Sequence, residues 1–127
     1  MSKRRETIEQ ALRRLLANGP LTAFPTRPED EQLLLLLAAR RFEPRREYRE
    51  AEVNERLREW LSSFVAPYGF DHVTLRRRLV DTGLLLRDAA GSTYWTLRRA
   101  PAIDIDPAKV LAEVREERAE RKRQHAP

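Results

Sequence analysis

Hydrophobic residues recur every three or four positions in two stretches, which is the spacing of an amphipathic helix. The first stretch runs from Thr7 to Asn18 and is closed by Gly19-Pro20. The second follows Tyr48 and continues to Phe64. The apolar positions are Ile8, Ala11, Leu12, Leu15 and Leu16 in the first helix, and Val53, Leu57, Trp60, Leu61 and Phe64 in the second. Each helix therefore has one apolar side that needs a covering surface.

A run of five leucines, Leu33–Leu37, lies between these helices, in a predicted helix that spans Glu29–Phe42. Consecutive leucines point in every direction around a helix, so two surfaces must cover this one. The rest of the domain can cover one side. We expect the other side to be covered either by a terminal helix of the same chain or by a homodimer interface through Leu34 and Leu35.

The stretch from Asp71 to Trp95 predicts a helix followed at once by a hairpin. Asp71 suits the first position of a helix and Gly83 its end. After Gly83, LLLRD and TYWTLR are rich in strand formers and are joined by a link that contains Gly91. Tyr94 and Trp95 alternate faces, and we expect Trp95 to be the buried one. The segment PRREY, ending at Tyr48, is a candidate for a third strand.

The order of these elements predicts a mainly α protein with a small β-hairpin. Helix, turn, helix and hairpin form a winged helix-turn-helix, here with extra N-terminal and C-terminal helices. We place the winged-helix domain at residues 29–100. Residues 1–28 precede it as a basic arm, an amphipathic helix and a proline-rich connector. Residues 101–127 follow as a charged helix that begins at Asp106-Pro107.

The composition excludes several kinds of site. The 127 residues contain no cysteine and only His72 and His125, so neither a disulfide framework nor a thiolate or multi-histidine metal site can form. No run of 18 apolar residues occurs, and no apolar signal core follows the charged start. We expect a cytoplasmic protein without a metal, a cofactor or a membrane partner.

Catalytic motifs do not occur in the sequence either. Glycine totals four, so a glycine-rich phosphate loop is not available, and no nucleophile motif accompanies the acidic residues. His72 lies on the packing side of its predicted helix, where a core or capping role explains it. We therefore do not expect an enzyme.

The net charge of +5 is unevenly distributed. Six basic and two acidic residues lie in 1–28, and six basic and three acidic residues lie in 69–100. Residues 29–68 are net acidic, and 101–127 are neutral. Of the 25 basic residues 22 are arginine, which a GC-rich genome also produces, so the distribution is more informative than the total. The excess falls where a DNA-facing surface of a winged helix would lie.

The arginines of the predicted recognition helix separate into two roles. Arg76 lies within the apolar side, where it needs a carboxylate from the preceding helix, and Glu52, Glu55 or Glu59 could supply it. Arg77 and Arg78 point outward, and Arg78 is the better candidate for DNA because Asp81 stands four positions after Arg77. The predicted DNA-binding residues of helix and wing are Thr74, Arg77, Arg78, Arg87, Arg98 and Arg99.

The runs YREAEVNERL, DHVTLRRRLVDTGLLLRD and STYW resemble a prokaryotic domain-of-unknown-function family, found alone or fused to ArsR-like winged-helix transcriptional regulators. The resemblance covers Phe24 to Trp95, and its core is TLRR-x-LVD-x-G-L, from Thr74 to Leu84. It implies a winged-helix-like fold and a role in transcription. The chain departs from the family at Arg49, where a capping hydroxyl is usual, and in a longer VAPYGF turn.

Two functions follow as expectations. The first is a winged-helix protein that binds double-stranded DNA and regulates transcription. The alternative is a non-catalytic interaction or dimerisation module that keeps the winged-helix fold without DNA binding.

Overall fold

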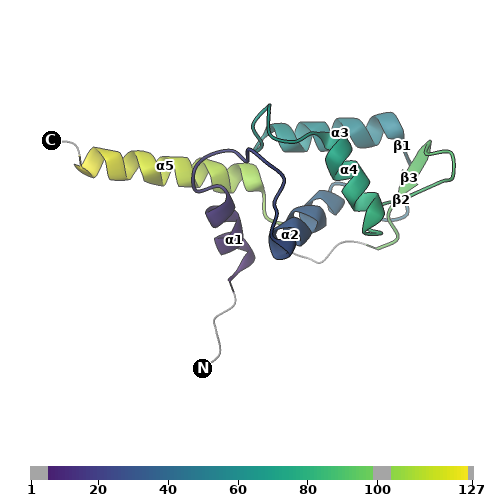
Figure 1. The fold of residues 1–127 in the computed structure, drawn as a ribbon, viewed down its shortest axis with the longest axis horizontal. Coiled ribbons are helices and arrows are strands. Elements are labelled where there is room, and N and C mark those ends of the chain that lie inside the picture. Colours follow the sequence, from purple (N-terminus) through teal and green to yellow (C-terminus); the bar gives the residue numbers. More distant parts are fainter. Residues whose placement is uncertain (1–5, 99–103, 126–127) are drawn as a thin grey trace, which may run out of the picture.

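A computed structural model of the chain describes residues 6–98 and 104–125. Its helices and strands are labelled in Figure 1. In chain order they are α1 (Ile8–Leu15), α2 (Pro28–Ala39), β1 (Tyr48–Arg49), α3 (Glu50–Ser62), α4 (His72–Asp81), β2 (Leu86–Arg87), β3 (Thr93–Trp95) and α5 (Pro107–His125).

The three strands form one antiparallel sheet in the order β1-β3-β2. Tyr48 of β1 pairs with Tyr94 of β3, and Arg87 of β2 pairs with the same Tyr94 from the other side. From α2 to β3 the order is helix, strand, two helices and two strands, which is the order of a winged helix-turn-helix. The expected mainly α protein with a small hairpin is thus confirmed, and the segment that ends at Tyr48 does supply the third strand.

The local signals at the helix ends act as their residue types suggest. The Asp71 carboxylate accepts the Thr74 N–H at 2.9 Å and so begins α4. That bond, with a second one from the Thr74 hydroxyl, lowers the pKa of Asp71 below its usual value. Gly83 adopts a φ of 77° just after α4, a conformation that favours glycine. At α3 the Glu52 carboxylate accepts the Arg49 N–H at 3.2 Å, although Arg49 has no capping hydroxyl.

The buried face of the wing differs from the expectation. Tyr94 is 2% exposed and belongs to the core, whereas Trp95 is only half-buried, so the expected burial of Trp95 is wrong. The register explains the difference, because Tyr94 stands directly opposite Tyr48, which is also buried. These two rings share the side of the sheet that faces the helices.

The leucine-rich helix α2 is covered within the chain. Leu34 and Leu35 are 3% and 2% exposed, which corrects their assignment to a dimer interface. Leu34 lies next to Leu12 of α1 and Phe64, which follows α3, and α2 packs on α4 as well. Helix α1 therefore covers the side of α2 that a second subunit could otherwise have covered.

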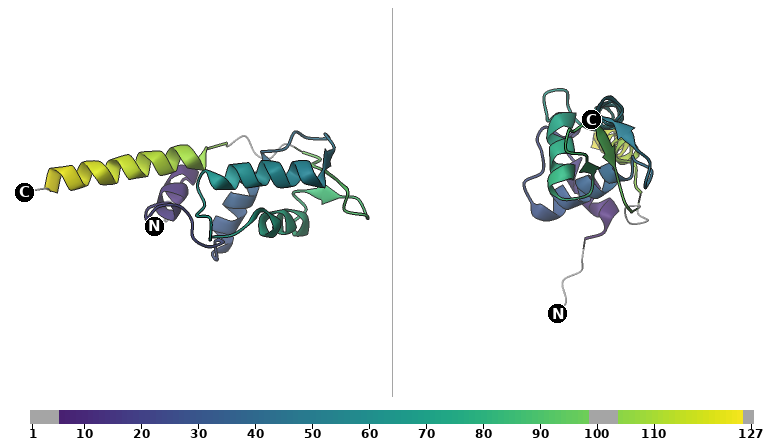
Figure 2. Two further views of the ribbon diagram at one scale, coloured as in Figure 1. Left: turned by 90° about the horizontal axis from the view of Figure 1, so that it is seen from above. Right: turned by 90° about the vertical axis from the view of Figure 1, so that its right-hand side faces the viewer.

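The terminal helices α1 and α5 pack on each other (Figure 1). Arg13 of α1 donates to Glu117 of α5 at 2.9 Å, and Arg14 donates to the buried Asp30 of α2 at 2.7 Å. The Arg14 hydrogen bonds lower the pKa of Asp30. Beyond Val114 every described residue of α5 is exposed, and this half of the helix extends away from the rest of the molecule (Figure 2).

Candidate nucleic-acid interface

Helix α4 has a buried side and an exposed side. Leu75 and Leu79 are fully buried against the neighbouring helices, while Thr74 and Arg77 are exposed. Within the part of the chain that the structure describes, the guanidinium of Arg77 has no hydrogen bond or ion pair with another side chain. The outward direction predicted for Arg77 is therefore correct, and its donors are available to an external acceptor.

Arg78 was predicted to point outward like Arg77, but its side chain is held by an ion pair. Its Nε donates to the Glu31 carboxylate of α2 at 2.8 Å, and its Nη2 contacts the same oxygen. Asp81 lies at 3.9 Å from its other terminal nitrogen. From the sequence, Arg78 was the better candidate for DNA because Asp81 stands four positions after Arg77. In the structure it is Arg78 that is neutralised, so the order of the two is reversed.

Arg76 forms the structural ion pair that its position on the helix predicts. Its side chain is 15% exposed, and its Nη1 lies 3.1 Å from the Glu50 carboxylate and also contacts the amide oxygen of Asn54. Both partners belong to α3, so the ion pair and the helix are as predicted. The partner residue is a correction, since it is Glu50, in the first turn of α3, rather than the expected Glu52, Glu55 or Glu59.

The wing is short and is held by an acidic turn. The Asp88 carboxylate accepts the N–H and the hydroxyl of Ser92, both at 2.8 Å, and these bonds lower the pKa of Asp88. Arg87 and Arg98 are exposed near the two ends of the hairpin. The predicted site residue Arg99 lies outside the described residues. The wing thus offers Arg87 beside its turn, Arg98 after its last strand, and small residues within the turn.

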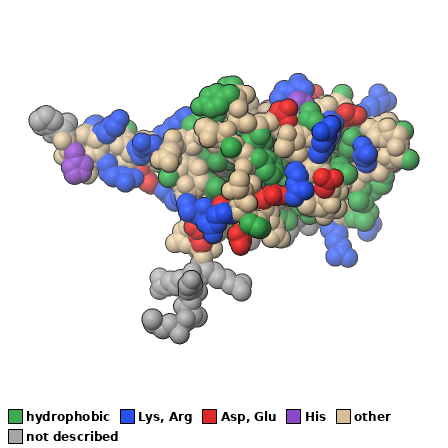
Figure 3. All heavy atoms as spheres, in the orientation of Figure 1, with side chains coloured by type: hydrophobic (Ala, Val, Ile, Leu, Met, Phe, Trp, Pro, Cys, Tyr) green, Lys and Arg blue, Asp and Glu red, His purple; other side chains and the backbone are tan. Residues whose placement is uncertain are grey.

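The exposed side of α4 is open to solvent. Helix α1 packs on α5 and α2, at the other end of the molecule from the wing (Figure 1). In Figure 3, basic and acidic side chains alternate over the part of the surface around α4. The interface consequently depends on a few separate arginines rather than on a broad positive patch.

Two residues that bear on this surface were not identified from the sequence. Glu31 is an acid in the first turn of α2, and its partner Arg78 is 47 positions away, so no local signal joins them. Tyr68, 79% exposed, stands in the turn between α3 and α4. An aromatic residue among proline and glycine could have indicated an exposed contact residue there.

The chemistry of the remaining candidates is limited. His72 is half-buried, and burial together with the nearby Arg58 lowers its pKa, so it is neutral at pH 7. Among the described residues, no group of three or more His, Cys, Asp or Glu side chains could hold a metal ion. No described helix has the length and apolar composition to span a bilayer.

No curated protein and no solved structure was found to match the chain. A family of proteins described as uncharacterized and conserved in bacteria, DUF2087, matches residues 20–96, which include all elements from α2 to β3. This region agrees with the resemblance noted between Phe24 and Trp95. The chain therefore belongs to the DUF2087 family of bacterial proteins.

Proposed function

We propose that this protein binds double-stranded DNA through its winged helix and acts in transcriptional regulation. The observation that supports it is Arg77, an exposed arginine on the open side of α4 without a partner among the described residues. The second helix of a helix-turn-helix is the element that enters the major groove. Arg77 and the preceding Thr74 would then face the bases or the phosphates.

The other exposed arginines fit a supporting role. Arg87 lies beside the turn of the wing and Arg98 follows its last strand, and both would meet the sugar-phosphate backbone. Phosphate contacts fix the position of a protein on the duplex, whereas contacts to base edges determine the sequence. Arg77 is the residue of this set that a groove-inserted α4 would bring to a guanine edge.

The test is a fluorescence-anisotropy titration of the full chain with duplex fragments of bacterial genomic DNA, at two salt concentrations. Arg77→Ala is compared with Arg115→Ala, an exposed arginine of α5 far along the chain from the interface. If Arg77 contacts a phosphate, its loss lowers the slope of log affinity against log salt by about 0.9. If it contacts a guanine, preference at that base pair relaxes by about 1–3 kcal/mol.

A second function, a protein-interaction module, is favoured by one observation. The ion pair between Arg78 and Glu31 neutralises half of the arginine pair on α4 that DNA would use. The titration above separates the two functions. A wild-type protein with no salt-dependent affinity for any duplex at near-physiological salt would contradict DNA binding and support the interaction module. Light scattering in the same buffers would then report whether the partner is a second copy of the chain.

A further inference from the structure

The turn between α3 and α4, residues 63–71, holds an aromatic side chain in solvent. Tyr68 is 79% exposed, the highest value for a large hydrophobic side chain among the described residues. Its hydroxyl has no hydrogen-bond partner within the described part of the chain. A large ring and a free hydroxyl are therefore available to an external partner.

This turn is anchored on both sides of Tyr68. Before Tyr68, the backbone of the turn exchanges two hydrogen bonds, of 3.0 and 2.8 Å, with Leu21 of the segment between α1 and α2. At Gly69 an added Cβ would lie 2.9 Å from the Leu21 oxygen, so the two backbones are too close for a side chain there. After it, the Phe70 ring meets the Phe24 ring edge to face, with centres 5.1 Å apart. The exposure of Tyr68 is thus set by a packed turn.

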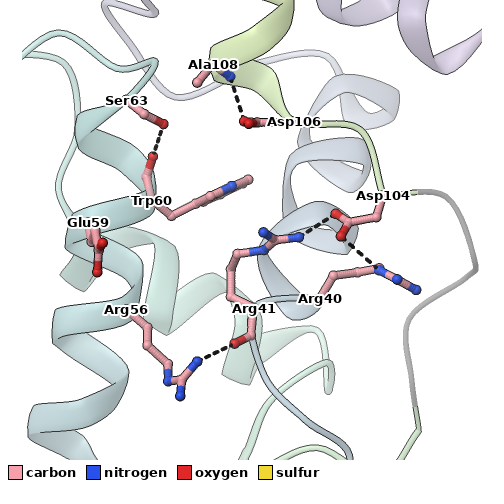
Figure 4. Close-up of a pocket in the computed structure, with 9 residues that line it drawn as sticks. All are labelled: Arg40, Arg41, Arg56, Glu59, Trp60, Ser63, Asp104, Asp106 and Ala108. Atoms are coloured by element: carbon pink, nitrogen blue, oxygen red, sulfur yellow. Dashed lines mark hydrogen bonds and ion pairs between the residues drawn. The ribbon is translucent and has the colours of Figure 1, made fainter.

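The two arginines within α3 differ in their surroundings. Arg56 donates to the backbone oxygen of Arg41 at 3.2 Å and is used inside the chain (Figure 4). Arg58 is exposed, and its guanidinium has no hydrogen bond or ion pair with any described residue. Arg58 is therefore available to an external acceptor, as Arg77 is.

Arg58 lies beside the turn and the start of α4. Together with Pro67 and His72 it lines a hollow of about 200 Å³ where α3 ends and α4 begins. Burial and then the charge of Arg58 lower the pKa of His72, which is consistent with a cation close to the first turn of α4. The end of α3 and the turn that follows it thus present a cation and a neutral donor, Arg58 and Tyr68.

Helix α4 lies between this turn and the wing (Figure 1, Figure 2). The turn leads into the start of α4, and the wing follows its end. A helix fills the major groove, which is about 12 Å wide, so a sugar-phosphate strand borders the helix on either side. Arg87 and Arg98 supply cations on the side of the wing. Arg58 and Tyr68 stand where the other strand would pass.

We infer that Arg58 and Tyr68 bind the phosphate backbone of duplex DNA on the side of α4 opposite the wing. The Arg58 guanidinium pairs with a phosphate, and the Tyr68 hydroxyl donates to a phosphate oxygen. Backbone contacts on both sides then fix the position of α4 in the groove. The inference rests on the proposed function, because it adds a second strand contact to the same interface.

Fluorescence anisotropy of the full chain with a labelled duplex of bacterial genomic DNA, over a series of sodium chloride concentrations, tests the inference. Arg58→Gln is expected to lower the slope of log affinity against log salt by about 0.9, because one phosphate contact is lost. Arg58→Lys keeps the charge and should keep the slope. Tyr68→Phe removes only a neutral hydroxyl, so it is expected to weaken binding about tenfold with the slope unchanged.

Arg115→Gln is the matched control, because Arg115 is an exposed arginine of α5 and its loss changes the net charge equally. The slope for this variant should remain that of the wild type. Arg58 and Tyr68 are exposed as well, so their variants are expected to fold as the wild type does, which circular dichroism checks.

The same titrations separate this inference from the proposed function. A wild-type protein without salt-dependent affinity for the duplex would overturn both. If the wild type binds and Arg77→Ala weakens binding, an unchanged slope for Arg58→Gln with an unchanged affinity for Tyr68→Phe would overturn the contact by the turn alone. An equal fall in slope for Arg58→Gln and Arg115→Gln would also overturn it, since net charge would then explain the effect.

Discussion

Arg78 of α4 is ion-paired with Glu31 of α2, with its Nε donating to the Glu31 carboxylate at 2.8 Å. The pair joins the first turn of α2 to the last turn of the proposed recognition helix. It therefore has two effects. It adds a cross-link between two packed helices, and it removes one positive charge from the surface that DNA would approach.

Glu31→Gln is expected to strengthen DNA binding. The substitution keeps the size of the side chain but removes its charge, so Arg78 becomes available to a phosphate. One additional phosphate contact steepens the slope of log affinity against log salt by about 0.9. The loss of a partly exposed ion pair lowers the free energy of unfolding by no more than about 1 kcal/mol. Anisotropy titrations at two salt concentrations and urea unfolding measure the two effects.

Glu29→Gln is the matched control, because Glu29 is an exposed acid in the same helical turn whose nearest cation is Arg27. An equal gain in affinity from both substitutions would mean that net charge alone, and not release of Arg78, is responsible.

Arg76→Ala is expected to destabilise the protein, whereas Arg77→Ala is not. Arg76 is 15% exposed and holds Glu50 and Asn54 of α3, while Arg77 is exposed. Because Glu50 is 47% exposed, its charge remains hydrated when Arg76 is removed. The cost is then that of the lost hydrogen bonds, about 1–2 kcal/mol. Urea unfolding monitored by circular dichroism compares the two variants, and equal midpoints would contradict the structural role of Arg76.

Those parts of the fold that depend on local chemistry could be predicted from the sequence. Asp71 and Gly83 bracket α4 because capping and positive φ are properties of single residues. The buried side of the hairpin could not be predicted in the same way. Alternation shows only that Tyr94 and Trp95 face opposite sides, and the pairing of Tyr94 with Tyr48 decides which side is buried.

The candidate site was predictable to the same degree. The helical wheel shows that Arg76 needs a carboxylate from α3 and that Arg77 points outward. It does not show which turn of α3 lies opposite Arg76, and so Glu50 was not identified. The ion pair between Glu31 and Arg78 depends on packing between elements that are distant in sequence, and periodicity carries no information about it.

Leu35→Glu is expected to unfold the domain rather than to dissociate a dimer. Leu35 is 2% exposed within the single chain, so the new carboxylate would be buried without a partner. Substitutions of this kind cost several kcal/mol, of the order of the total stability of a small domain. Circular dichroism and light scattering report folding and mass together. Leu97→Glu, at a position that is 60% exposed, is the control and should fold as the wild type does. A folded Leu35→Glu monomer with an unchanged melting temperature would contradict the buried environment.

Asp71→Ala should lower the stability of the protein in a pH-dependent manner. Its carboxylate caps α4 through the Thr74 N–H and hydroxyl, and these hydrogen bonds lower the pKa of Asp71 below 3.8. A lowered pKa in the folded state means that the ionised cap stabilises the protein above pH 3.8 and loses this effect as the pH falls through the folded value. At pH 7 the substitution should therefore cost about 1 kcal/mol, and the difference from the wild type should shrink below pH 3.8.

Thr7→Ala is the matched control, because Thr7 caps α1 by accepting the Gln10 N–H at 3.1 Å with a hydroxyl that does not titrate in this range. Its cost should stay constant with pH. Urea unfolding of both variants and the wild type between pH 7 and pH 3 measures the free energies of unfolding. If Asp71→Ala were less stable than the wild type by the same amount at every pH, the cap would not depend on the charge of the carboxylate.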